Sequence, residues 1–478
     1  MNGALTDAVL TGLPGVTAWQ LVRDGGQDTL LVAGPPPETR PPAGPGRDDA
    51  RDDARAVSRA AAAGDAAVRG TDPAALPALM RQLDEAALLT TARLLDRTRL
   101  FRDGGRRGTD EILGALAVAP RHAWIIRRWL ATLTAEGRLR LDAATGRYHS
   151  LTVPDRSAHA RALRELDGAC RGLGYPASMT RFFRAAAERL PLLLQDRTSL
   201  QEVLFPDGET STARGNYRDS VPSRWANHAA ASLVTDEADH RTTPAPLRVL
   251  EAGAGVGGTT GTVLEALGDT PVDYLFTDVS PFFLRTARDV FGDRPGLRHA
   301  LFDIQADPLG QGLGPGSQDV VLAANVLHNA RHAGRCLAAL RELLAPDGLL
   351  VLVESCQEHY QALISMYLLM SPAPGEQDWF TDLRAGQDRV FLTAGEWTRQ
   401  LDAAGFDPLP VLPHEGHPLT EAAGQRVVAG RVRSHGARPD PARVRAALAD
   451  RLSPALPLPR IHAVDDVIRP IIPTGAPC

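Results

Sequence analysis

The chain of 478 residues contains no lysine, so all 52 of its basic side chains apart from histidine are arginines. This absence excludes any chemistry that needs a lysine amine, including Schiff-base catalysis, the phosphate contact of a P-loop and an adenylate-forming site. The formal net charge is −5, which gives the molecule as a whole no attraction to nucleic acid or to an anionic membrane.

Cysteine is also scarce. The four cysteines, Cys170, Cys336, Cys356 and Cys478, lie far apart and form no CxxC pair. This spacing excludes a disulfide framework and a structural zinc site, and it is typical of a reducing compartment. No apolar run reaches the length of a membrane span, and the N-terminus lacks the pattern of a signal peptide. We therefore expect a cytoplasmic protein with no metal and no membrane partner.

The length predicts two to four domains. The segment after residue 33 is rich in Pro, Gly, Arg and Asp and has little to bury, which indicates a linker. Changes of pattern along the chain predict the following order: 1–33, first part of a small terminal module; 34–75, linker; 76–155, winged-helix-like helical module; 156–240, helical lid over a substrate; 241–436, α/β core; 437–478, second part of the terminal module.

The winged-helix interpretation concerns two helices followed by two short strands. Thr109 is expected to cap the first helix, and the second helix follows Pro120. This order is found in DNA-binding modules. No surplus of positive charge marks the second helix, so we favour a packing or dimerisation module beside an enzyme core.

From Leu247 onward, short apolar strands alternate with helices. This alternation predicts a parallel sheet covered by helices on both faces. The predicted strands are "LRVLEAG", "VDYLFTDV", "LRHALFD", "DVVLAANV" and "GLLVLVES", followed by a helix over 396–404 and two strands near 407–412 and 425–433.

The first of these strands leads into a glycine-rich turn and a helix, "LRVLEAGAGVGGTTGTVLEAL". Gly253 and Gly255 let the backbone turn sharply and approach a ligand closely. The following helix N-terminus offers unpaired N–H groups and a partial positive charge. Taken alone, this turn fits a dinucleotide equally well.

Three carboxylates at consecutive strand ends favour S-adenosylmethionine (SAM) as the cofactor. Glu251 can receive the amino group of SAM and balance its sulfonium, whereas it would repel a pyrophosphate. Asp278 can accept both ribose hydroxyls, and Asp303 falls near the adenine amino group. We include their neighbours Val279 and Ile304 in the predicted cofactor site.

A histidine and a glutamate follow the fourth and fifth strands. His328 lies in "AANVLHNARH" and Glu354 ends "LLVLVES", so both are expected at the carboxyl edge of the sheet, where open α/β folds bind ligands. A carboxylate there can fix the imidazole tautomer and stabilise its protonated form. The pair could remove a proton from an acceptor. It could equally be a helix cap beside a buried strand end.

The residues from about 76 to 433 resemble the C-methyltransferase domains of polyketide synthases and their relatives in nonribosomal peptide synthetases. The resemblance rests on "LEAGAGVGGTT", "YLFTDVSPFF", "LFDIQADPLGQG", "ANVLHNARHAGRCLAALRELLAPDGLLVLVES" and "EWTRQLDAAGF", with "VLFPDG" and "YRDSVPSRWANH" upstream. It implies a Rossmann-like class I fold with seven strands, the last antiparallel. It also implies a His328–Glu354 base dyad, a catalytic and substrate-binding Tyr217, a substrate-binding Asn227 and a cofactor-side Asn325.

Two features point to the peptide-synthetase branch of this resemblance. The segment after Glu354, "LISMYLLMSPAPGEQDWF", lacks the Trp-rich stretch of the polyketide-type members. It is closer to relatives that handle cysteine-derived thiazolines. The two ends of the chain, 7–33 and 440–478, resemble a split adenylation C-terminal subdomain, but Gly475 is followed by Ala476 and not by lysine, so no adenylation chemistry is expected.

The resemblance implies a stand-alone, SAM-dependent methyltransferase of natural-product biosynthesis. Its substrate is expected to be an acyl or thiazoline-type intermediate held on an acyl or peptidyl carrier protein, with methylation at carbon and no nucleic-acid partner. The alternatives are an N- or O-methyltransferase acting on a small molecule and a non-catalytic scaffold that binds SAM or docks a carrier.

Overall fold

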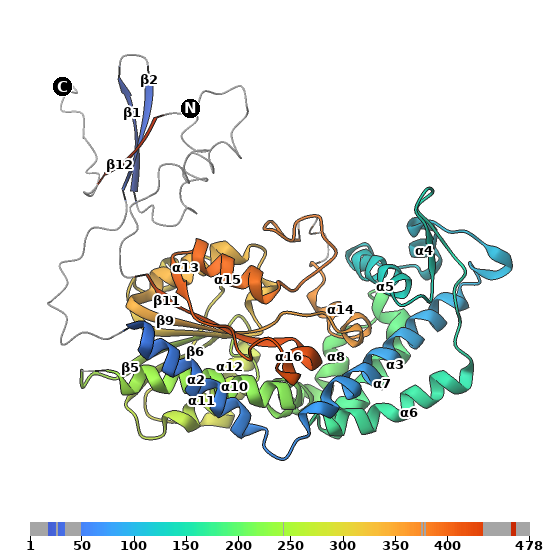
Figure 1. The fold of residues 1–478 in the computed structure, drawn as a ribbon, viewed down its shortest axis with the longest axis horizontal. Coiled ribbons are helices and arrows are strands. Elements are labelled where there is room, and N and C mark those ends of the chain that lie inside the picture. Colours follow the sequence, from blue (N-terminus) through green and yellow to red (C-terminus); the bar gives the residue numbers. More distant parts are fainter. Residues whose placement is uncertain are drawn as a thin grey trace.

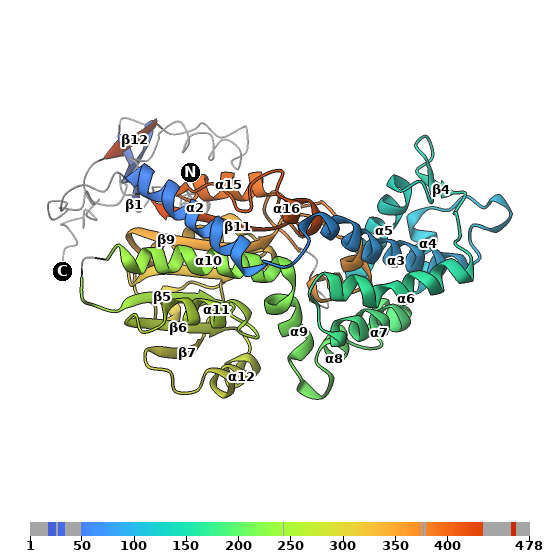
Figure 2. The same cartoon turned by 60° about the horizontal axis from the view of Figure 1, so that its bottom comes forward.

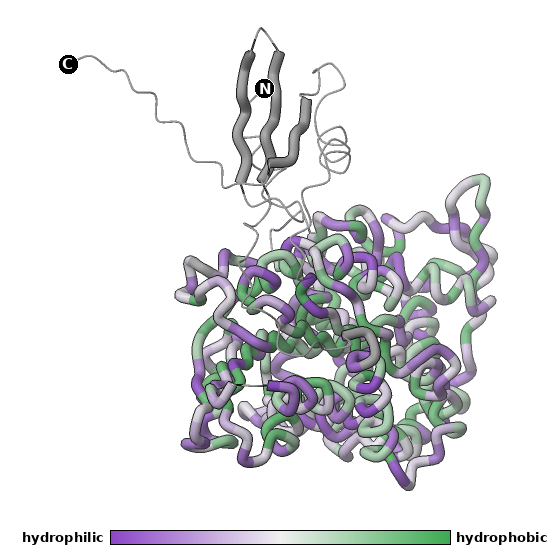
Figure 3. The backbone as a smooth tube through the Cα atoms, turned by 60° about the vertical axis from the view of Figure 1, so that its left-hand side comes forward, coloured by the Kyte–Doolittle hydropathy of each residue, from purple (hydrophilic) through white to green (hydrophobic). Residues whose placement is uncertain are grey.

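The structure, a computed structural model, describes residues 18–24, 27–33, 49–241, 243–373, 376, 379–433 and 460–464. An α/β core and a helical lobe make up most of it (Figure 1). Among the described residues, no helix combines the length and the apolar character that crossing a membrane requires. Hydrophobic segments run mainly through the interior of the molecule, and hydrophilic segments dominate its outer turns (Figure 3).

The core contains one sheet of seven strands in the order β10-β11-β9-β8-β5-β6-β7. Strand β11 is antiparallel to both of its neighbours, whereas the remaining strands run parallel to one another. This confirms the predicted fold class, including its antiparallel last strand. The strands are β5 (Leu247–Ala252), β6 (Val272–Asp278), β7 (Leu297–Leu301), β8 (Gln318–Ala324), β9 (Leu344–Ser355), β10 (Phe406–Pro408) and β11 (Gln425–Val432).

Helices cover both faces of this sheet (Figure 2). Successive side chains of a strand point to opposite faces, so Val249 packs into one apolar cluster and Leu250 into the other. Burial on both faces explains why these strands are apolar almost throughout. The covering helices are α10 (Val221–Asp239), α11 (Gly258–Leu267), α12 (Pro281–Phe291), α13 (Ala333–Leu343), α15 (Ala394–Ala403) and α16 (Pro418–Ala423).

The helical lobe precedes the core in sequence and packs beside it (Figure 2). It consists of α3 (Leu76–Arg97), α4 (Thr109–Leu116), α5 (Ala123–Ala135), β3 (Arg140–Asp142), β4 (Arg147–His149), α6 (Arg156–Gly172), α7 (Ala177–Leu194), α8 (Leu200–Leu204) and α9 (Ser211–Arg214), and ends in a π-helical turn, Gly215–Asp219. A short helix that follows β9 in the sequence, α14 (Tyr367–Met370), contacts α8 of this lobe.

Two helices and a hairpin occur in the winged-helix order, but the surface of the second helix is occupied. Trp129 of α5 is buried and donates to the Leu363 carbonyl at 3.0 Å. Arg127 and Arg128 form ion pairs with Asp388 and Glu358. These carboxylates neutralise the arginines that a DNA-recognition helix would present, which supports a packing role. The N-cap of α4 is Gly108 and not Thr109, because Glu111 bonds back to the Gly108 N–H.

The predicted linker 34–75 contains a helix, α2 (Asp49–Ala67), and is in that part wrong. The helix lies along α10, where the Trp225 indole donates to Asp65 at 2.8 Å and Arg59 pairs with Asp236. Its buried side chains are small, mainly Ala56 and Ala60. Alanine gives only a weak hydrophobic signal in a sequence, yet it allows two helices to approach closely.

The two chain ends meet in a separate sheet. Strands β1 (Ala18–Asp24) and β2 (Gln27–Ala33) form an antiparallel hairpin, and β12 (Arg460–Val464) pairs parallel to β2. The segments predicted as halves of one terminal module therefore share hydrogen bonds. Its likeness to an adenylation subdomain stays a prediction. The sequence "DPARVRAALADRL" predicts a helix over 440–452, and these residues lie outside the part of the chain that the structure describes.

Substitution of alanine for Gly64 and for Gly168 should change stability in opposite directions. A Cβ at Gly64 would lie 2.5 Å from the buried Trp225 ring, whereas one at Gly168 would meet nothing within 4 Å. Because overpacking typically costs about 1–3 kcal/mol, Gly64→Ala should lower the thermal midpoint. Gly168→Ala should raise it, since alanine is favoured in helices by about 0.5–1 kcal/mol. Equal shifts of the two midpoints would contradict the α2–α10 contact.

Candidate active site

The carboxyl ends of the central strands bring the predicted residues to one edge of the sheet. Glu251 lies in β5, Asp278 ends β6, Glu354 lies near the end of β9, and His328 follows β8 directly. Ligands of open α/β sheets bind at this edge. The structure therefore places these four residues at the edge of the sheet that the sequence predicted.

The glycine turn between β5 and α11 has the conformation that lets a ligand approach the backbone closely. Gly253, Gly255 and Gly257 all have positive φ, which favours glycine. A Cβ at Gly253 would lie 2.6 Å from Val326, whereas one at Gly255 would meet open space. The Gly255 N–H donates to Asp278 Oδ2 at 3.0 Å, so the turn is tied to the end of β6. The backbone at Gly255 is left accessible to a ligand.

Glu251 is buried at the base of this turn. Its Oε2 accepts hydrogen bonds from the hydroxyls of Thr260 and Tyr274, each at 2.6 Å. Its Oε1 is also buried but has no hydrogen-bond partner among the described residues. Burial raises the pKa of Glu251 to about 7, although the two hydroxyl donors lower it. A buried carboxylate with one unpaired oxygen fits a site that a cationic ligand completes.

The other predicted cofactor residues surround this position. Asp278 accepts from the backbone of Gly255 and Ser280, and burial raises its pKa. Val279 is 65% exposed, a large apolar surface that an adenine could cover. Asp303 lies at the surface just past β7, followed by the half-buried Ile304.

Asn325 lies between the cofactor residues and the dyad. It adopts a left-handed backbone conformation, with φ of 57°, and its N–H donates to the Val353 carbonyl at 2.6 Å. Such strain is found at functional sites, where the surrounding structure holds it in place. Its side chain accepts a bond from Ser355 at 3.4 Å.

His328 and Glu354 form the hydrogen-bonded pair that the sequence predicted. Nδ1 of His328 lies 2.6 Å from Glu354 Oε2, and both side chains are buried. The other carboxylate oxygen accepts the N–H groups of Val326 and Leu327 at 3.1 and 2.8 Å. The Asn329 amide lies 3.2 Å from Nε2 and can donate to it. This network assigns the tautomer that carries its proton on Nδ1 and leaves Nε2 as the basic atom.

Arg384 holds the loop that carries His328, a role that no sequence pattern indicated. The guanidinium is fully buried, donates to the carbonyls of His328 and Ala330 at 2.6 and 2.7 Å, and pairs with Asp382. Phe391 packs edge-on against the imidazole, with ring centroids 5.3 Å apart. Sequence reasoning missed these contacts because they come from a loop more than fifty residues downstream.

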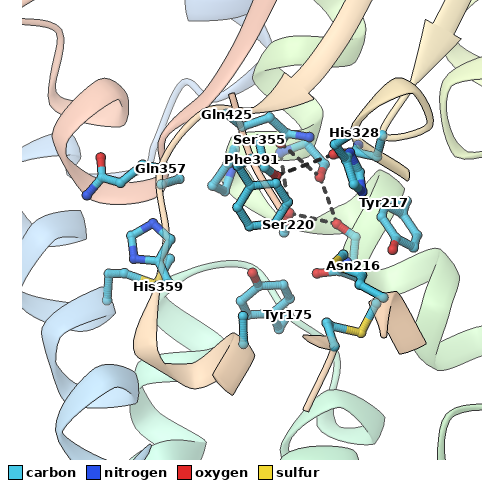
Figure 4. A pocket seen from close by; sticks show the side chains of 18 residues that line it. Tyr175, Asn216, Tyr217, Ser220, His328, Ser355, Gln357, His359, Phe391 and Gln425 are labelled. Carbon is cyan, nitrogen blue, oxygen red and sulfur yellow. Dashed lines mark hydrogen bonds between the residues drawn. The ribbon is translucent and has the colours of Figure 1, made fainter. Parts of the chain in front are cut away.

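A cavity of about 140 Å³ lies beside His328, between the core and the helical lobe. Figure 4 shows the side chains that line it, including the Tyr175 hydroxyl and the His359 ring pointing inward. Both ring nitrogens of His359 are buried and have no hydrogen-bond partner, although Nδ1 lies 3.5 Å from the Asp84 carboxylate. Three methionines, Met80, Met366 and Met370, give the cavity apolar walls.

Tyr217 and Asn227 are in contact, but they differ in their position relative to the cavity. Tyr217 lines the cavity, and burial raises the pKa of its hydroxyl. Asn227 does not line it. Its amide donates to the Tyr217 carbonyl at 2.9 Å and its oxygen accepts from Thr259 at 2.9 Å, so both ends are used inside the protein. The substrate-binding role of Asn227 stays a prediction, and in the structure the residue joins Tyr217 to the cofactor helix α11.

Comparisons with known proteins agree with this geometry. Residues 250–350 match the family model described as "Methyltransferase domain". Pyochelin synthetase PchF of Pseudomonas aeruginosa is 30% identical over 384 residues, 79% of this chain and 20% of that protein. The crystal structure of the CurJ carbon methyltransferase superposes with a TM-score of 0.71 at 25% identity, covering 80% of this chain and 99% of that one. The trans-methyltransferase CalH, solved with SAH, gives 0.54 at 25% identity over 73% and 90%.

The chain is therefore a methyltransferase that uses S-adenosylmethionine. More particularly, it has the fold of the carbon-methyltransferase domains of polyketide synthases, and its relatives are polyketide and nonribosomal-peptide synthetases. The chain spans about a fifth of the length of PchF. The residues at the glycine turn fit the cofactor: the unpaired Oε1 of Glu251 suits its cationic end, and the Asp278 carboxylate suits its ribose.

Cofactor binding should release a proton near neutral pH. Because burial raises the pKa of free Glu251 to about 7, and a bound cation favours its carboxylate, binding at lower pH must first displace a proton. Affinity should therefore fall up to about tenfold per pH unit below 7. Calorimetry in two buffers of different ionisation enthalpy measures the released proton. Glu251→Gln should remove this release; a wild-type heat that does not depend on the buffer would refute the assignment.

Proposed function

We propose that this chain transfers the methyl group of SAM to an acidic carbon of an acyl or thiazoline-type intermediate, with His328 as the base. The observation that carries this proposal is the buried His328–Glu354 pair, whose imidazole lies at the wall of the cavity. SAM is already an activated electrophile, so the protein must orient the acceptor and, for a carbon acid, remove its proton.

The hydrogen bonds around the imidazole suit it to this task. Glu354 accepts from Nδ1, so a proton taken up at Nε2 would create an imidazolium beside a buried carboxylate. That carboxylate is held by two backbone N–H groups and cannot swing away from the ring. Arg384 fixes the backbone of the same loop. Glu354 and the loop therefore need little reorganisation when Nε2 takes up a proton, whereas the Asn329 amide must turn away from Nε2 to admit the acceptor.

The cavity supports an acceptor with one polar and one apolar side. Tyr175 and His359 offer polar groups opposite His328, and the three methionines offer adaptable apolar contacts. Deprotonation of carbon next to a carbonyl or imine places negative charge on the oxygen or nitrogen. The Nε2 atom of His359, which has no hydrogen-bond partner among the described residues, and the Tyr175 phenol are groups that can donate to that atom.

The relatives support an acceptor held on a carrier. PchF and the polyketide synthase ThaG of Burkholderia thailandensis are far longer than this chain, which spans 20% and 4% of their lengths. Their size is that of multidomain synthetases. We infer that the partner of this chain is an acyl or peptidyl carrier protein that presents the acceptor as a thioester.

The test is methylation of small thioesters in place of the carrier-bound acceptor. Purified protein with isotopically labelled SAM would be incubated with N-acetylcysteamine thioesters of a 3-ketoacid and of a thiazoline carboxylic acid, and the methylated atom located by NMR. Label on carbon supports the proposal. Label on nitrogen or oxygen would assign the dyad to another acceptor. SAM binding without turnover on these thioesters or on carrier-bound forms would favour a scaffold.

His328→Ala should lower kcat by about 10²–10⁴-fold, the usual contribution of a general base. The dissociation constant of SAM should stay within twofold, because His328 contacts no residue of the glycine turn in the structure. Calorimetry and single-turnover rates measure the two quantities separately. His228→Ala serves as a matched control, since it changes an exposed histidine that does not line the cavity. An unchanged kcat in His328→Ala would exclude this residue as the base.

His359→Leu should lower kcat/KM by roughly ten- to a hundredfold, the usual range for a lost hydrogen bond to a charged group. The reason is that His359 lines the cavity and its Nε2 has no hydrogen-bond partner among the described residues, while Nδ1 lies near Asp84. SAM affinity should not change, because His359 lies away from the glycine turn. His359→Gln should recover part of the activity, as the amide can still donate. Full activity of the leucine variant would show that the acceptor does not reach this wall.

A further inference from the structure

A second cavity, of about 360 Å³, lies among α3, α6 and α7 in the helical lobe. It shares no lining residue with the catalytic cavity, and it is the larger of the two. Figure 2 shows these three helices grouped in the lobe beside the α/β core. Its size falls in the range of pockets that hold small organic molecules. The methyl-transfer mechanism makes no use of it.

Four arginines converge on this cavity. Arg93 and Arg97 come from α3, Arg164 from α6 and Arg184 from α7. None of the four forms an ion pair with a carboxylate within the part of the chain that the structure describes. The lining contains one acidic residue, Glu188. The cavity therefore carries a formal charge of about +3, four guanidiniums less one carboxylate, with no internal neutralisation.

The two inner arginines are held in place by the backbone. Arg93 donates to the Pro154 carbonyl at 3.3 Å, and Arg184 donates to the Leu163 carbonyl at 2.9 Å. The Nε of Arg184 is nevertheless buried without a hydrogen-bond partner. A buried N–H of a charged group that lacks an acceptor is costly, so this atom marks a position that a ligand oxygen could fill.

His159 lies in the same wall, close to the positive charges of Arg93 and Arg97. His159 Nε2 lies 3.1 Å from Thr90 Oγ1, which itself donates to the Ala86 carbonyl, so the imidazole is the donor in this pair. Burial lowers the pKa of His159, and the charges of Arg93 and Arg97 lower it further. The ring thus stays neutral beside guanidiniums that have no anion to balance them.

The composition of the walls narrows the class of ligand. A guanidinium can donate two parallel hydrogen bonds to two oxygens of one phosphate. A phosphate dianion also balances the surplus positive charge of the cavity better than a single carboxylate does. The rest of the wall is aliphatic, formed by Leu94, Leu163, Leu190, Pro191 and alanines. The cavity lining contains no phenylalanine, tyrosine or tryptophan, and its one aromatic ring, the imidazole of His159, is bonded to Thr90, so a nucleobase finds little surface on which to stack.

We propose that the cavity between α3, α6 and α7 is a binding site for an aliphatic phosphate ester, separate from the catalytic site. The phosphate contacts the four arginines, and the carbon chain packs on the leucines of the wall. Binding requires neither SAM nor His328. The site therefore stands whether or not the chain methylates carbon.

The test uses five probes, of which 4′-phosphopantetheine and pantetheine differ only in the phosphate. Calorimetry on the full chain, at low and at moderate salt, would compare 4′-phosphopantetheine with pantetheine, and glycerol 3-phosphate and AMP with inorganic phosphate. We expect the two aliphatic phosphates to bind at least tenfold more tightly than pantetheine and AMP, with affinity falling as salt rises. Inorganic phosphate should bind more weakly than either ester.

The variants are chosen to keep the fold. Arg97→Gln and Arg164→Gln change exposed arginines that form no hydrogen bond or ion pair among the described residues, and together they should weaken phosphopantetheine binding at least tenfold. Arg161→Gln removes one charge from α6 outside the cavity, as Arg164→Gln does inside it, and should leave binding within twofold. Equal weakening by Arg161→Gln would reduce the effect to net charge and overturn the proposal. So would the absence of binding by both aliphatic phosphates, or equal binding of pantetheine.

Discussion

The Glu354 carboxylate is the interaction on which the active site depends. It accepts three hydrogen bonds, one from His328 and two from the backbone N–H groups that follow β8. Because β8 and β9 are neighbouring parallel strands, one side chain joins their carboxyl ends and fixes the imidazole between them. A buried carboxylate is stable only when its oxygens are satisfied, so the loop after β8 must adopt this shape.

The helical lobe supplies the wall of the cavity that lies opposite the sheet edge. The sheet edge positions the cofactor and the base, whereas the opposite wall of the cavity comes from Met80, Tyr175 and the π-helical turn that carries Tyr217. Helix α5, with its arginines paired to Glu358 and Asp388, anchors the segments that follow β9. The helices in winged-helix order thus pack against the segment after β9, and the arginines of α5 are engaged there.

The sequence predicted the features that are local or that follow from strand order. Glu251, Asp278, His328 and Glu354 each end or follow an apolar strand, and parallel strands bring such positions together. It missed features that depend on contacts between distant segments. The alanine-rich helix α2 has too few large apolar residues to stand out in the sequence, and nothing in the sequence distinguishes Arg384 from other arginines. The inward orientation of His359 depends on how α3 packs against the segment that follows β9. The sequence also contains no sign of the two hydrogen bonds that Asn227 forms with Tyr217 and Thr259.

Those two bonds have a consequence for the order of events. Asn227 connects the Tyr217 carbonyl to Thr259, in the first turn of the helix that follows the glycine turn. The space beside Gly258 is closed by that same carbonyl, only 2.7 Å from where a Cβ would stand. A displacement of the cofactor helix would therefore also displace Tyr217, which lines the cavity proposed for the acceptor. The kinetic expectation is an ordered sequence, in which the cofactor enters first and the demethylated cofactor leaves last.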